Sequence, residues 1–349
     1  PDTHGGIMYP NTQYFRRKIL FNAGKSKKLA LLAAMALVGG GAFAQSAYAA
    51  DVTIDSAHPP LRNVPNLDDL AKPNSAASVG DGAENASGNT LTVNAYKEDS
   101  LSVFGGVARG TGDAADNTVR IKGSATEIAS IYGGSAWGTG SAKGNKVYFD
   151  AGTVSFAEWM VGGYVGRSGN AENNVIEVNG GKTSALYGGF SNRSDATGQI
   201  RGNHVVIRRG TIDGKVYGGA FGGARAAGDV THNTVTITGG TVKRTVCGGA
   251  LEKNDATGNV THNEVTVAGG TLRQDIIGGY TRRGGHLTGN IVTITGGEIQ
   301  GNVYAAMSAG NTSTIRDNVV NLGDGKNELA AGTESAKYIF GASGGNRAS

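Results

Sequence analysis

Residues 230–249 read VTHNTVTITGGTVKRTVCGG and contain the pattern that decides the fold. Val235 and Ile237 alternate with threonines, which is the period-two pattern of a half-buried β-strand, and a glycine pair closes this run. A second short run, TVC at residues 245–247, also precedes a glycine pair. Residues 260–279, VTHNEVTVAGGTLRQDIIGG, repeat the unit almost letter for letter. The stretch is therefore one copy of a repeat that contains two strands.

Two markers carry this repeat along the chain. The first, Asn-x-apolar-x-apolar, recurs at spacings of 28, 28, 29, 29, 30, 30, 27 and 28 residues. It begins at Asn89, Asn117, Asn145, Asn174, Asn203, Asn233, Asn263, Asn290 and Asn318. The second marker, an apolar residue before Gly-Gly, keeps the same step and weakens towards the end; its apolar residues are Phe104, Tyr132, Val161, Tyr187, Tyr217, Cys247, Ile277, Tyr304 and Phe340. Fixed periods of about 20 to 50 residues are typical of solenoids, propellers and arrays.

The length and pattern of the repeat choose among these architectures. Apolar residues do not recur at helical spacing, and a propeller blade needs four strands in about 40 to 45 residues. We therefore predict an all-β fold, a parallel β-helix (β-solenoid) with about nine rungs of 27–30 residues. We expect it to be right-handed because parallel crossovers generally are. Rungs stacked about 4.8 Å apart would form a rod on the order of 40 Å long.

Glycine and asparagine have physical reasons to recur in such a coil. Glycine reaches the backbone angles of tight corners at little steric cost, so we assign both glycine pairs to corners. Asparagine tolerates left-handed angles and forms side-chain ladders when turns stack, so we expect a column of Asn203, Asn233, Asn263 and Asn290. The residues before the second glycine pair should form another column, which we expect to be buried. Strict alternation with neighbours such as Val246 would instead point this column outward.

Residues 1–49 have the three-part layout of a secretory signal peptide. Met8 is the expected start; an extended basic stretch, a short apolar run at residues 29–38 and small residues follow. The apolar run is too short to span a membrane, and we expect cleavage after Ala49. Removing residues 1–49 takes six of 32 basic and one of 28 acidic residues, which leaves 26 and 27 and a formal charge of −1. Nucleic acid is therefore not an expected partner, because binding phosphate requires a basic surface.

The remainder of the chain divides by composition. Residues 50–88 hold four of the six prolines and are expected to form an extended lead-in or N-terminal cap. Residues 89–325 are the rungs, and residues 326–349 are an irregular end or the start of a further rung. Inserted segments of repeats often form the binding face, so ligand contacts are expected in the variable segments after each Gly-Gly marker. These segments are 107–116, 135–144, 190–202, 220–229, 250–258 and 280–289.

The sequence predicts no catalytic, cofactor-binding or metal-binding residue. His232 and His262 occupy equivalent positions on adjacent rungs, so their side chains should lie about 5 Å apart. Two stacked imidazoles could share a metal, but Gly202 and Gly289 flank them and offer no third ligand, so we expect exposed corner residues. The lone cysteine, Cys247, excludes an internal disulfide and is expected to be a small buried apolar residue.

Motifs of other functional classes are missing from the sequence. The Asp-Ala-Thr-Gly loops at 195–198 and 255–258 do not follow the Gly-Gly-x-Gly-x-Asp pattern of calcium-binding solenoids. No phosphate-binding loop ends in Lys-Ser/Thr, and no Gly-x-Ser-x-Gly nucleophile elbow is present. A polysaccharide-cleaving β-helix would need acidic and basic side chains gathered on neighbouring rungs. The nearest basic candidates, expected to form a solvated surface, are Arg208, Arg209, Lys243, Arg244, Arg273, Arg282 and Arg283.

A signal peptide with a long basic part, followed by repeats such as TITGGTV at 236–242 and VYGG at 216–219, resembles the passenger region of bacterial autotransporters (type V secretion). The resemblance covers roughly residues 8–325 and is specific in architecture rather than in function. It implies a secreted β-helical passenger that a C-terminal outer-membrane β-barrel carries to the cell surface. Nothing after residue 325 supplies the alternating strands of a barrel, so we expect a fragment of a longer precursor or a truncated gene.

Two functions are compatible with these features. The first is a structural or adhesive passenger, exported to the outer membrane, the cell surface or the medium, that presents inter-rung loops to a host-cell or glycan ligand. It is favoured because the sequence consists largely of repetition and contains no unique polar constellation, so we expect no enzyme activity and no cofactor. The alternative is a polysaccharide-acting β-helix enzyme, a lyase or a hydrolase. It would require a groove in which several carboxylates and basic residues converge across three or more rungs.

Overall fold

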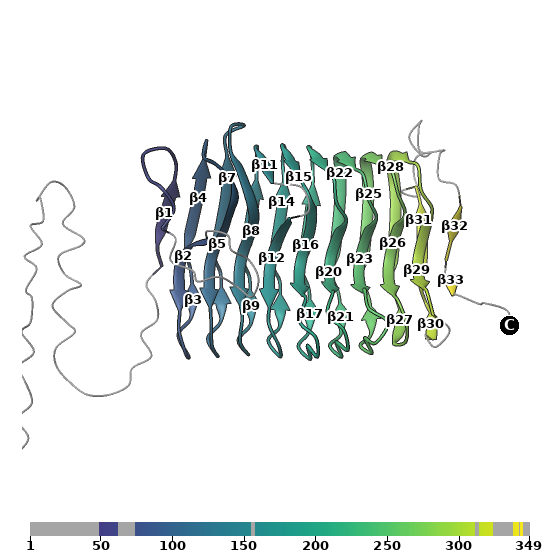
Figure 1. Cartoon of the computed structure of the whole chain (residues 1–349). Coiled ribbons are helices and arrows are strands. Elements are labelled where there is room, and N and C mark those ends of the chain that lie inside the picture. Colours follow the sequence, from purple (N-terminus) through teal and green to yellow (C-terminus); the bar gives the residue numbers. More distant parts are fainter. Residues whose placement is uncertain are drawn as a thin grey trace, which may run out of the picture. The chain divides into compact units, whose positions relative to one another are not determined.

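The computed structural model describes residues 49–61, 74–154, 158–310, 314–323, 338–341 and 343–344. These residues belong to one compact unit, 44–349. Its backbone winds as a parallel β-helix, with successive turns stacked in chain order from β1 to β33 (Figure 1). Neighbouring turns pair in parallel and in register, so the predicted fold class is confirmed. The predicted leader, residues 1–49, lies outside the described residues except for Ala49.

Three faces and a corner form each turn. The strands that follow the asparagine marker, together with β1, which pairs with the first of them, make the asparagine face. They are β1 (Asp51–Ile54), β4 (Thr90–Asn94), β7 (Thr118–Lys122), β10 (Lys146–Phe149), β14 (Val175–Val178), β18 (His204–Ile207), β22 (Thr234–Val242), β25 (Glu264–Leu272), β28 (Ile291–Ile299) and β31 (Val319–Leu322). A short middle face follows, made by the ends of β22, β25 and β28 and by β11 (Thr153–Val154), β15 (Lys182–Thr183) and β19 (Thr211–Ile212).

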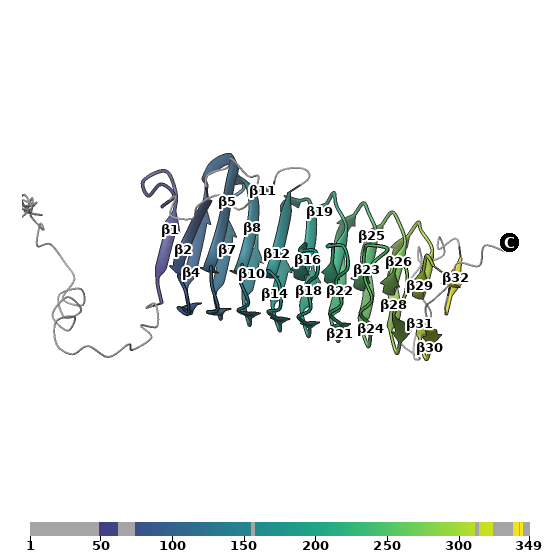
Figure 2. The ribbon, with the colours of Figure 1, turned by 60° about the horizontal axis from the view of Figure 1, so that its bottom comes forward.

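The strands that carry the second marker make the Gly-Gly face: β2 (Asn74–Gly80), β5 (Lys97–Ala108), β8 (Glu127–Ala136), β12 (Trp159–Val165), β16 (Ala185–Ser191), β20 (Val216–Phe221), β23 (Val246–Leu251), β26 (Ile276–Thr281), β29 (Val303–Ser308), β32 (Ile339–Phe340) and β33 (Ser343–Gly344). A separate nine-stranded corner sheet closes each turn, and its short strands lie along one edge of the stack (Figures 1 and 2). They are β3 (Ala86–Ser87), β6 (Ala114–Ala115), β9 (Ala142–Lys143), β13 (Ala171–Glu172), β17 (Ile200–Arg201), β21 (Val230–Thr231), β24 (Val260–Thr261), β27 (His286–Thr288) and β30 (Thr314–Arg316).

The aliphatic residues of the asparagine face fill the inside of the coil, as predicted. Val235 and Ile237 are fully buried, whereas Thr236 is partly exposed and Thr238 is exposed. Val235 lies in register with Val205 of the preceding turn and with Val265 of the next. Turn after turn, these side chains join those of the other faces in one continuous inner core. Burial of this repeated aliphatic column supplies the main stabilisation of the stack.

A ladder of asparagine side chains runs beside this core, as predicted for the column of Asn203, Asn233, Asn263 and Asn290. Asn203 Nδ2 donates to Asn233 Oδ1 at 2.8 Å, and the Asn203 backbone N–H donates to the same oxygen at 3.1 Å. Asn203 Nδ2 also donates to the carbonyl of Ala171 at 2.9 Å. Each interior amide is thus fully buried and fully hydrogen-bonded, which a buried amide requires. Eight complete turns separate the nine ladder asparagines, from Asn89 to Asn318.

The position before each ladder asparagine has a left-handed backbone. His232 and His262 both have φ of 55°, and the equivalent residues are Gly88, Asp116, Gly144, Asn173, Gly202, Gly289 and Asp317, all with positive φ. Glycine, asparagine, aspartate and histidine are the residues that adopt this conformation most readily. The residue type at this position therefore differs between rungs, but every residue found there can adopt the positive φ that the turn requires.

The two glycine pairs of the repeat turn out to have different causes. Gly240 has φ of +83° at the corner between the asparagine and middle faces, as predicted. The second pair was wrongly assigned to a corner, because β23 runs straight through Gly248 and Gly249. A Cβ on Gly249 would lie 2.5 Å from Cγ of Asn263. This pair is glycine because the asparagine ladder occupies the space that a side chain would need.

Adding a methyl group at this site should therefore destabilise the coil. For Gly249→Ala we expect a loss of about 1 to 3 kcal/mol in the free energy of unfolding, because the ladder must shift to admit the methyl group. Gly341→Ala is the control, since nothing lies within 4 Å of its Cβ position, and it should change stability by less than about 0.5 kcal/mol. Urea denaturation measures both changes. Equal midpoints for the two variants would contradict this explanation of the glycine pair.

A second polar ladder, which the sequence analysis missed, lies four residues before the asparagine ladder. Its side chains accept hydrogen bonds from the backbone N–H of the equivalent residue one turn later. Asp113 Oδ1 accepts from Ser141 N–H at 2.7 Å, and Asn170 Oδ1 accepts from Gln199 N–H at 2.8 Å. Asp, Asn and Ser all provide such an acceptor, so the residue type varies and the sequence shows only a weak signal.

The ends of the repeat region pair with the turns beside them. The stretch 50–88 was expected to be an extended lead-in or N-terminal cap, and its described parts contribute β1, β2 and β3, which pair with β4, β5 and β6. It lacks the asparagine marker because Ala50 takes that place, and its backbone N–H donates to Asn89 Oδ1 at 2.9 Å. Towards the C-terminal end, β32 and β33 both pair with β29. No described residue belongs to a helix long and apolar enough to cross a membrane.

Candidate functional site

The outward side of the Gly-Gly face carries a stripe of apolar side chains. Val246 belongs to the inner core, whereas its neighbour Cys247 belongs to a separate cluster, because adjacent strand residues point to opposite sides. The column before the glycine pairs is thus both outward-pointing and largely buried, with Tyr217 only 3% and Cys247 only 1% exposed. We call this separate cluster the outer stripe. Its buried members are Ala76, Phe104, Val107, Tyr132, Val161, Tyr187, Phe190, Tyr217, Ala220, Cys247, Ala250 and Ile277.

Five of the twelve buried members of the outer stripe are aromatic. The rings of Phe104 and Tyr132 stack with centroids 4.6 Å apart, and those of Tyr187 and Tyr217 stack at 5.2 Å. Phe190 lies beside Tyr187 at 4.1 Å. The turns of the coil stack at nearly the same step, so equivalent residues on successive turns place their rings face to face.

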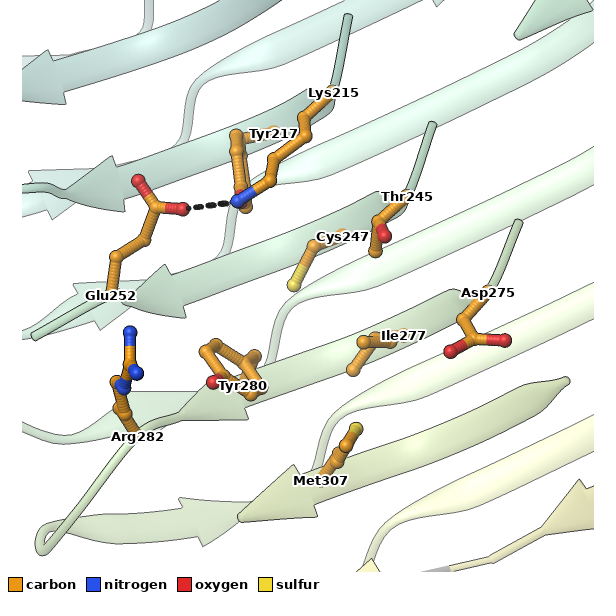
Figure 3. Close-up of a pocket in the computed structure, with 10 residues that line it drawn as sticks. All are labelled: Lys215, Tyr217, Thr245, Cys247, Glu252, Asp275, Ile277, Tyr280, Arg282 and Met307. Carbon is orange, nitrogen blue, oxygen red and sulfur yellow. Dashed lines mark hydrogen bonds and ion pairs between the residues drawn. The ribbon is translucent and has the colours of Figure 1, made fainter. Parts of the chain in front are cut away.

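The outer stripe has no ring on the turn after Tyr217, and a hollow of about 230 Å³ lies there. On the next turns the position of Tyr217 is taken by Cys247 and Ile277. Figure 3 shows these side chains on the floor of the hollow, between the charged residues of its rims. The lining residues are Lys215, Tyr217, Thr245, Cys247, Glu252, Asp275, Ile277, Tyr280, Arg282 and Met307.

An ion pair closes one end of the hollow. Lys215 Nζ lies 2.9 Å from Glu252 Oε1, and the same oxygen accepts the Tyr217 hydroxyl hydrogen bond at 2.5 Å. The Lys215 ammonium also lies 5.7 Å from the centre of the Tyr217 ring, within cation–π range. Lys215 immediately precedes β20, and Glu252 immediately follows β23. The pair therefore joins two turns across the outer stripe, beside Tyr217.

Burial sets the protonation state of the apolar floor. Burial, followed by the nearby Glu252 carboxylate, raises the pKa of Tyr217 well above its ordinary value. Burial likewise raises the pKa of the Cys247 thiol far above its ordinary value. The thiol therefore stays protonated near neutral pH, and an activated nucleophile needs the thiolate. The prediction that Cys247 is a small buried apolar residue is confirmed.

The rest of the lining has a hydroxyl and a carboxylate on one rim and a guanidinium on the other, beside Glu252 (Figure 3). Thr245 precedes β23, and Asp275 precedes β26. One oxygen of Asp275, Oδ1, accepts the backbone N–H of Asn302 at 2.8 Å, which ties it to the next turn. Arg282 follows β26 and is exposed, and within the described part of the chain its guanidinium has neither an ion pair nor a hydrogen-bond acceptor. Burial raises the pKa of the neighbouring Tyr280, and Arg282 opposes this rise.

The hollow is formed partly by the variable segments, where the sequence analysis placed the binding face. Glu252 comes from segment 250–258, and Tyr280 and Arg282 come from segment 280–289. The other lining residues lie on or just before the strands, where the sequence analysis did not look for a site. One signal in the sequence could have indicated the hollow: aligning the repeats shows that the tyrosine position is occupied by the smaller residues Cys247 and Ile277.

The remaining residues considered in the sequence do not converge on a site. The rings of His232 and His262 stack at 5.1 Å, as their spacing predicted. Arg208 pairs with Glu177 at 2.6 Å, and Lys243 pairs with Asp213 at 2.7 Å, so these bases are used in separate ion pairs. Within the described ranges, no three His, Cys, Asp or Glu side chains lie close enough together to hold a metal ion.

The Asp-Ala-Thr-Gly loops have a structural cause. Ala196 and Ala256 are both buried in a small cluster beside the corner sheet. In the related segment 220–229, a Cβ on Gly228 would lie 1.7 Å from the carbonyl oxygen of Gly198, so the turns meet backbone to backbone. These loops therefore anchor their own segments, 190–202 and 250–258, to the coil.

Comparison with protein-family models, with curated proteins and with solved structures finds no match to this chain.

Proposed function

We propose that this chain is the β-helical passenger of an autotransporter-like protein, exported to the cell surface or the medium, where it acts as a structural or adhesive rod. The observation that carries the proposal is the separation of a constant coil from variable outward segments. The inner core and the asparagine ladder repeat in every interior turn, whereas the segments after the Gly-Gly face change in length and charge. Per-repeat variation on one side of a solenoid is typical of a binding face.

The partner that we propose is a host-cell or glycan ligand that contacts several turns. Variable segments of successive turns project from the same edge of the stack, because the turns are held in register. An extended ligand can therefore contact equivalent segments one after another, and weak contacts add up along the rod. The leader-like residues 1–49 and the resemblance to autotransporter passengers support export.

A second candidate, a polysaccharide-acting enzyme, is favoured by one observation. The hollow contains two carboxylates and two cations from consecutive turns, Glu252, Asp275, Lys215 and Arg282. Glycoside hydrolysis uses a pair of carboxyl groups as acid and as base or nucleophile. In this hollow, however, Glu252 is paired with Lys215 and Tyr217, and Asp275 accepts a backbone N–H. Binding is therefore the better-supported role.

An adhesion assay with the full chain tests the proposed function. We expect the chain to bind immobilised glycans or host cells and to release no shorter oligosaccharide. Replacing exposed charges of the variable segments (Lys253, Asp255 and Arg283, each by Ser) should weaken adhesion at least tenfold. The matched control, Arg244→Ser with Arg273→Ser, removes exposed charges outside these segments and should leave adhesion unchanged. Release of product, or equal adhesion of the two variants, would argue against the proposal.

A further inference from the structure

The hollow is shaped like a missing ring of the aromatic stack. Two outward rows run along the Gly-Gly face, and each turn from β5 to β20 carries a ring in at least one of them, as at Tyr217 and Phe190. On the turn of β23 both rows carry small side chains, Cys247 and Ala250, and a ring returns at Tyr280. Successive rings in the intact stripe lie 4.6 to 5.2 Å apart. A flat ring placed over Cys247 would therefore continue the stack beyond Tyr217.

The rims offer hydrogen-bonding groups to the edge of such a ring. Thr245 and Asp275 stand on one rim, and Glu252 and Arg282 stand on the other (Figure 3). The floor between them is apolar: Ile277 is in register with Cys247 on the next turn, and Met307 lies one turn further along. A pyranose sugar matches this arrangement, because the two faces of its ring are apolar C–H surfaces and its hydroxyl groups lie around the edge. Concave sites with an apolar floor and a few convergent polar groups are typical ligand sites.

The charges of the rims favour an acidic sugar. The Lys215 charge is neutralised by Glu252 at 2.9 Å, and Asp275 is held by the Asn302 backbone. Arg282 is the charged lining residue with neither an ion pair nor a hydrogen-bonded side chain among the described residues. A guanidinium binds a carboxylate with two parallel hydrogen bonds, which is stronger than a neutral hydrogen bond.

We propose that this hollow binds the pyranose ring of a uronic acid within an extended glycan that runs along the coil axis. The ring lies over Cys247 against Tyr217, and its carboxylate pairs with Arg282. The rise of the coil, about 4.8 Å per turn, is close to the length of one sugar residue in an extended chain, so neighbouring sugars meet neighbouring turns. The assignment rests on the proposed adhesive function and adds the ligand chemistry and its site.

Refilling the missing ring is the sharpest test of the site. Cys247→Tyr introduces the residue that Tyr187 and Tyr217 provide on the preceding turns, so the fold should accept it. Isothermal titration calorimetry of the full chain would use hexamers of galacturonate, mannuronate and glucuronate, with cellohexaose as a neutral probe. We expect at least one acidic hexamer to bind at least tenfold more tightly than cellohexaose. Cys247→Tyr should weaken that binding at least tenfold, and Cys247→Val, which keeps the hollow, should change it less than threefold.

Further variants test the charge and guard against misfolding. Arg282→Gln should remove the preference for acidic hexamers, and Arg244→Gln, at an exposed arginine outside the variable segments, should keep it. If Cys247→Tyr loses its β-sheet circular dichroism, Ala250→Phe blocks the same hollow with the residue found at Phe190. Binding by none of the acidic hexamers, or equal binding of cellohexaose, overturns the assignment of the ligand. Unchanged binding by a folded hollow-blocking variant overturns the site alone, whereas failure of the chain to adhere to any glycan or cell overturns the proposed function as well.

Discussion

Val235→Asp should cost at least about 4 kcal/mol of folding free energy, because it places a carboxylate among aliphatic side chains with no partner. Val235 is fully buried, and its neighbours in register are Val205 and Val265. Each turn of a solenoid contacts only its neighbours, so one charge in the inner core weakens two interfaces at once. Urea denaturation followed by circular dichroism measures the loss.

Thr236→Asp provides the matched control one residue away. Thr236 is partly exposed on the outward side of the same strand, so the carboxylate keeps contact with water. We expect a change of less than about 1 kcal/mol. Hydrogen exchange of the full chain should localise the damage of Val235→Asp to the turns of β18, β22 and β25. Similar denaturation midpoints for both variants would refute the assignment of the strand faces.

The sequence predicted the coil because its determinants are periodic. The alternation at Val235 and Ile237 and the step of the asparagines each require one turn of about thirty residues, and both are visible without tertiary information. The asparagine column followed from the same step. What the sequence did not predict is why β23 contains glycine in its middle. Gly249 faces the ladder side chain of Asn263, which lies fourteen positions further along the chain and on the next turn.

The candidate hollow was harder to predict, because it consists of substitutions rather than of a motif. Cys247 and Ile277 lie in a column that was correctly expected to be buried, but the column faces away from the inner core. A pattern of alternation shows which residues share a side of a strand, and it does not show that an outward side is covered by its neighbours. The Lys215–Glu252 ion pair joins residues 37 positions apart, and only the stacking of the turns brings them together.

Asn233→Leu should be the second severe substitution, because it removes a fully buried amide that makes four hydrogen bonds. Its oxygen accepts from the Asn203 N–H and Nδ2, and its Nδ2 donates to the carbonyl of Ile200 at 2.9 Å and to Asn263 Oδ1 at 3.0 Å. Leucine has a similar volume and leaves these partners without replacement, since water does not reach them. Each buried group left unsatisfied costs about 1 to 3 kcal/mol, so we expect a total loss of about 3 to 5 kcal/mol.

Asn318→Leu separates the contribution of burial from that of the hydrogen bonds themselves. Asn318 accepts the same two bonds, from Asn290 N–H and Nδ2 at 2.9 Å each, but it is only partly buried. Water can replace the lost bonds there, so the free energy of unfolding should fall by less than about 1.5 kcal/mol. Denaturation midpoints compare the two variants, and hydrogen exchange should show lost protection of the Asn203 N–H, whose acceptor is Asn233 Oδ1, only in the first. If both substitutions cost the same, the ladder stabilises the coil through the number of its bonds, and its seclusion from water contributes nothing.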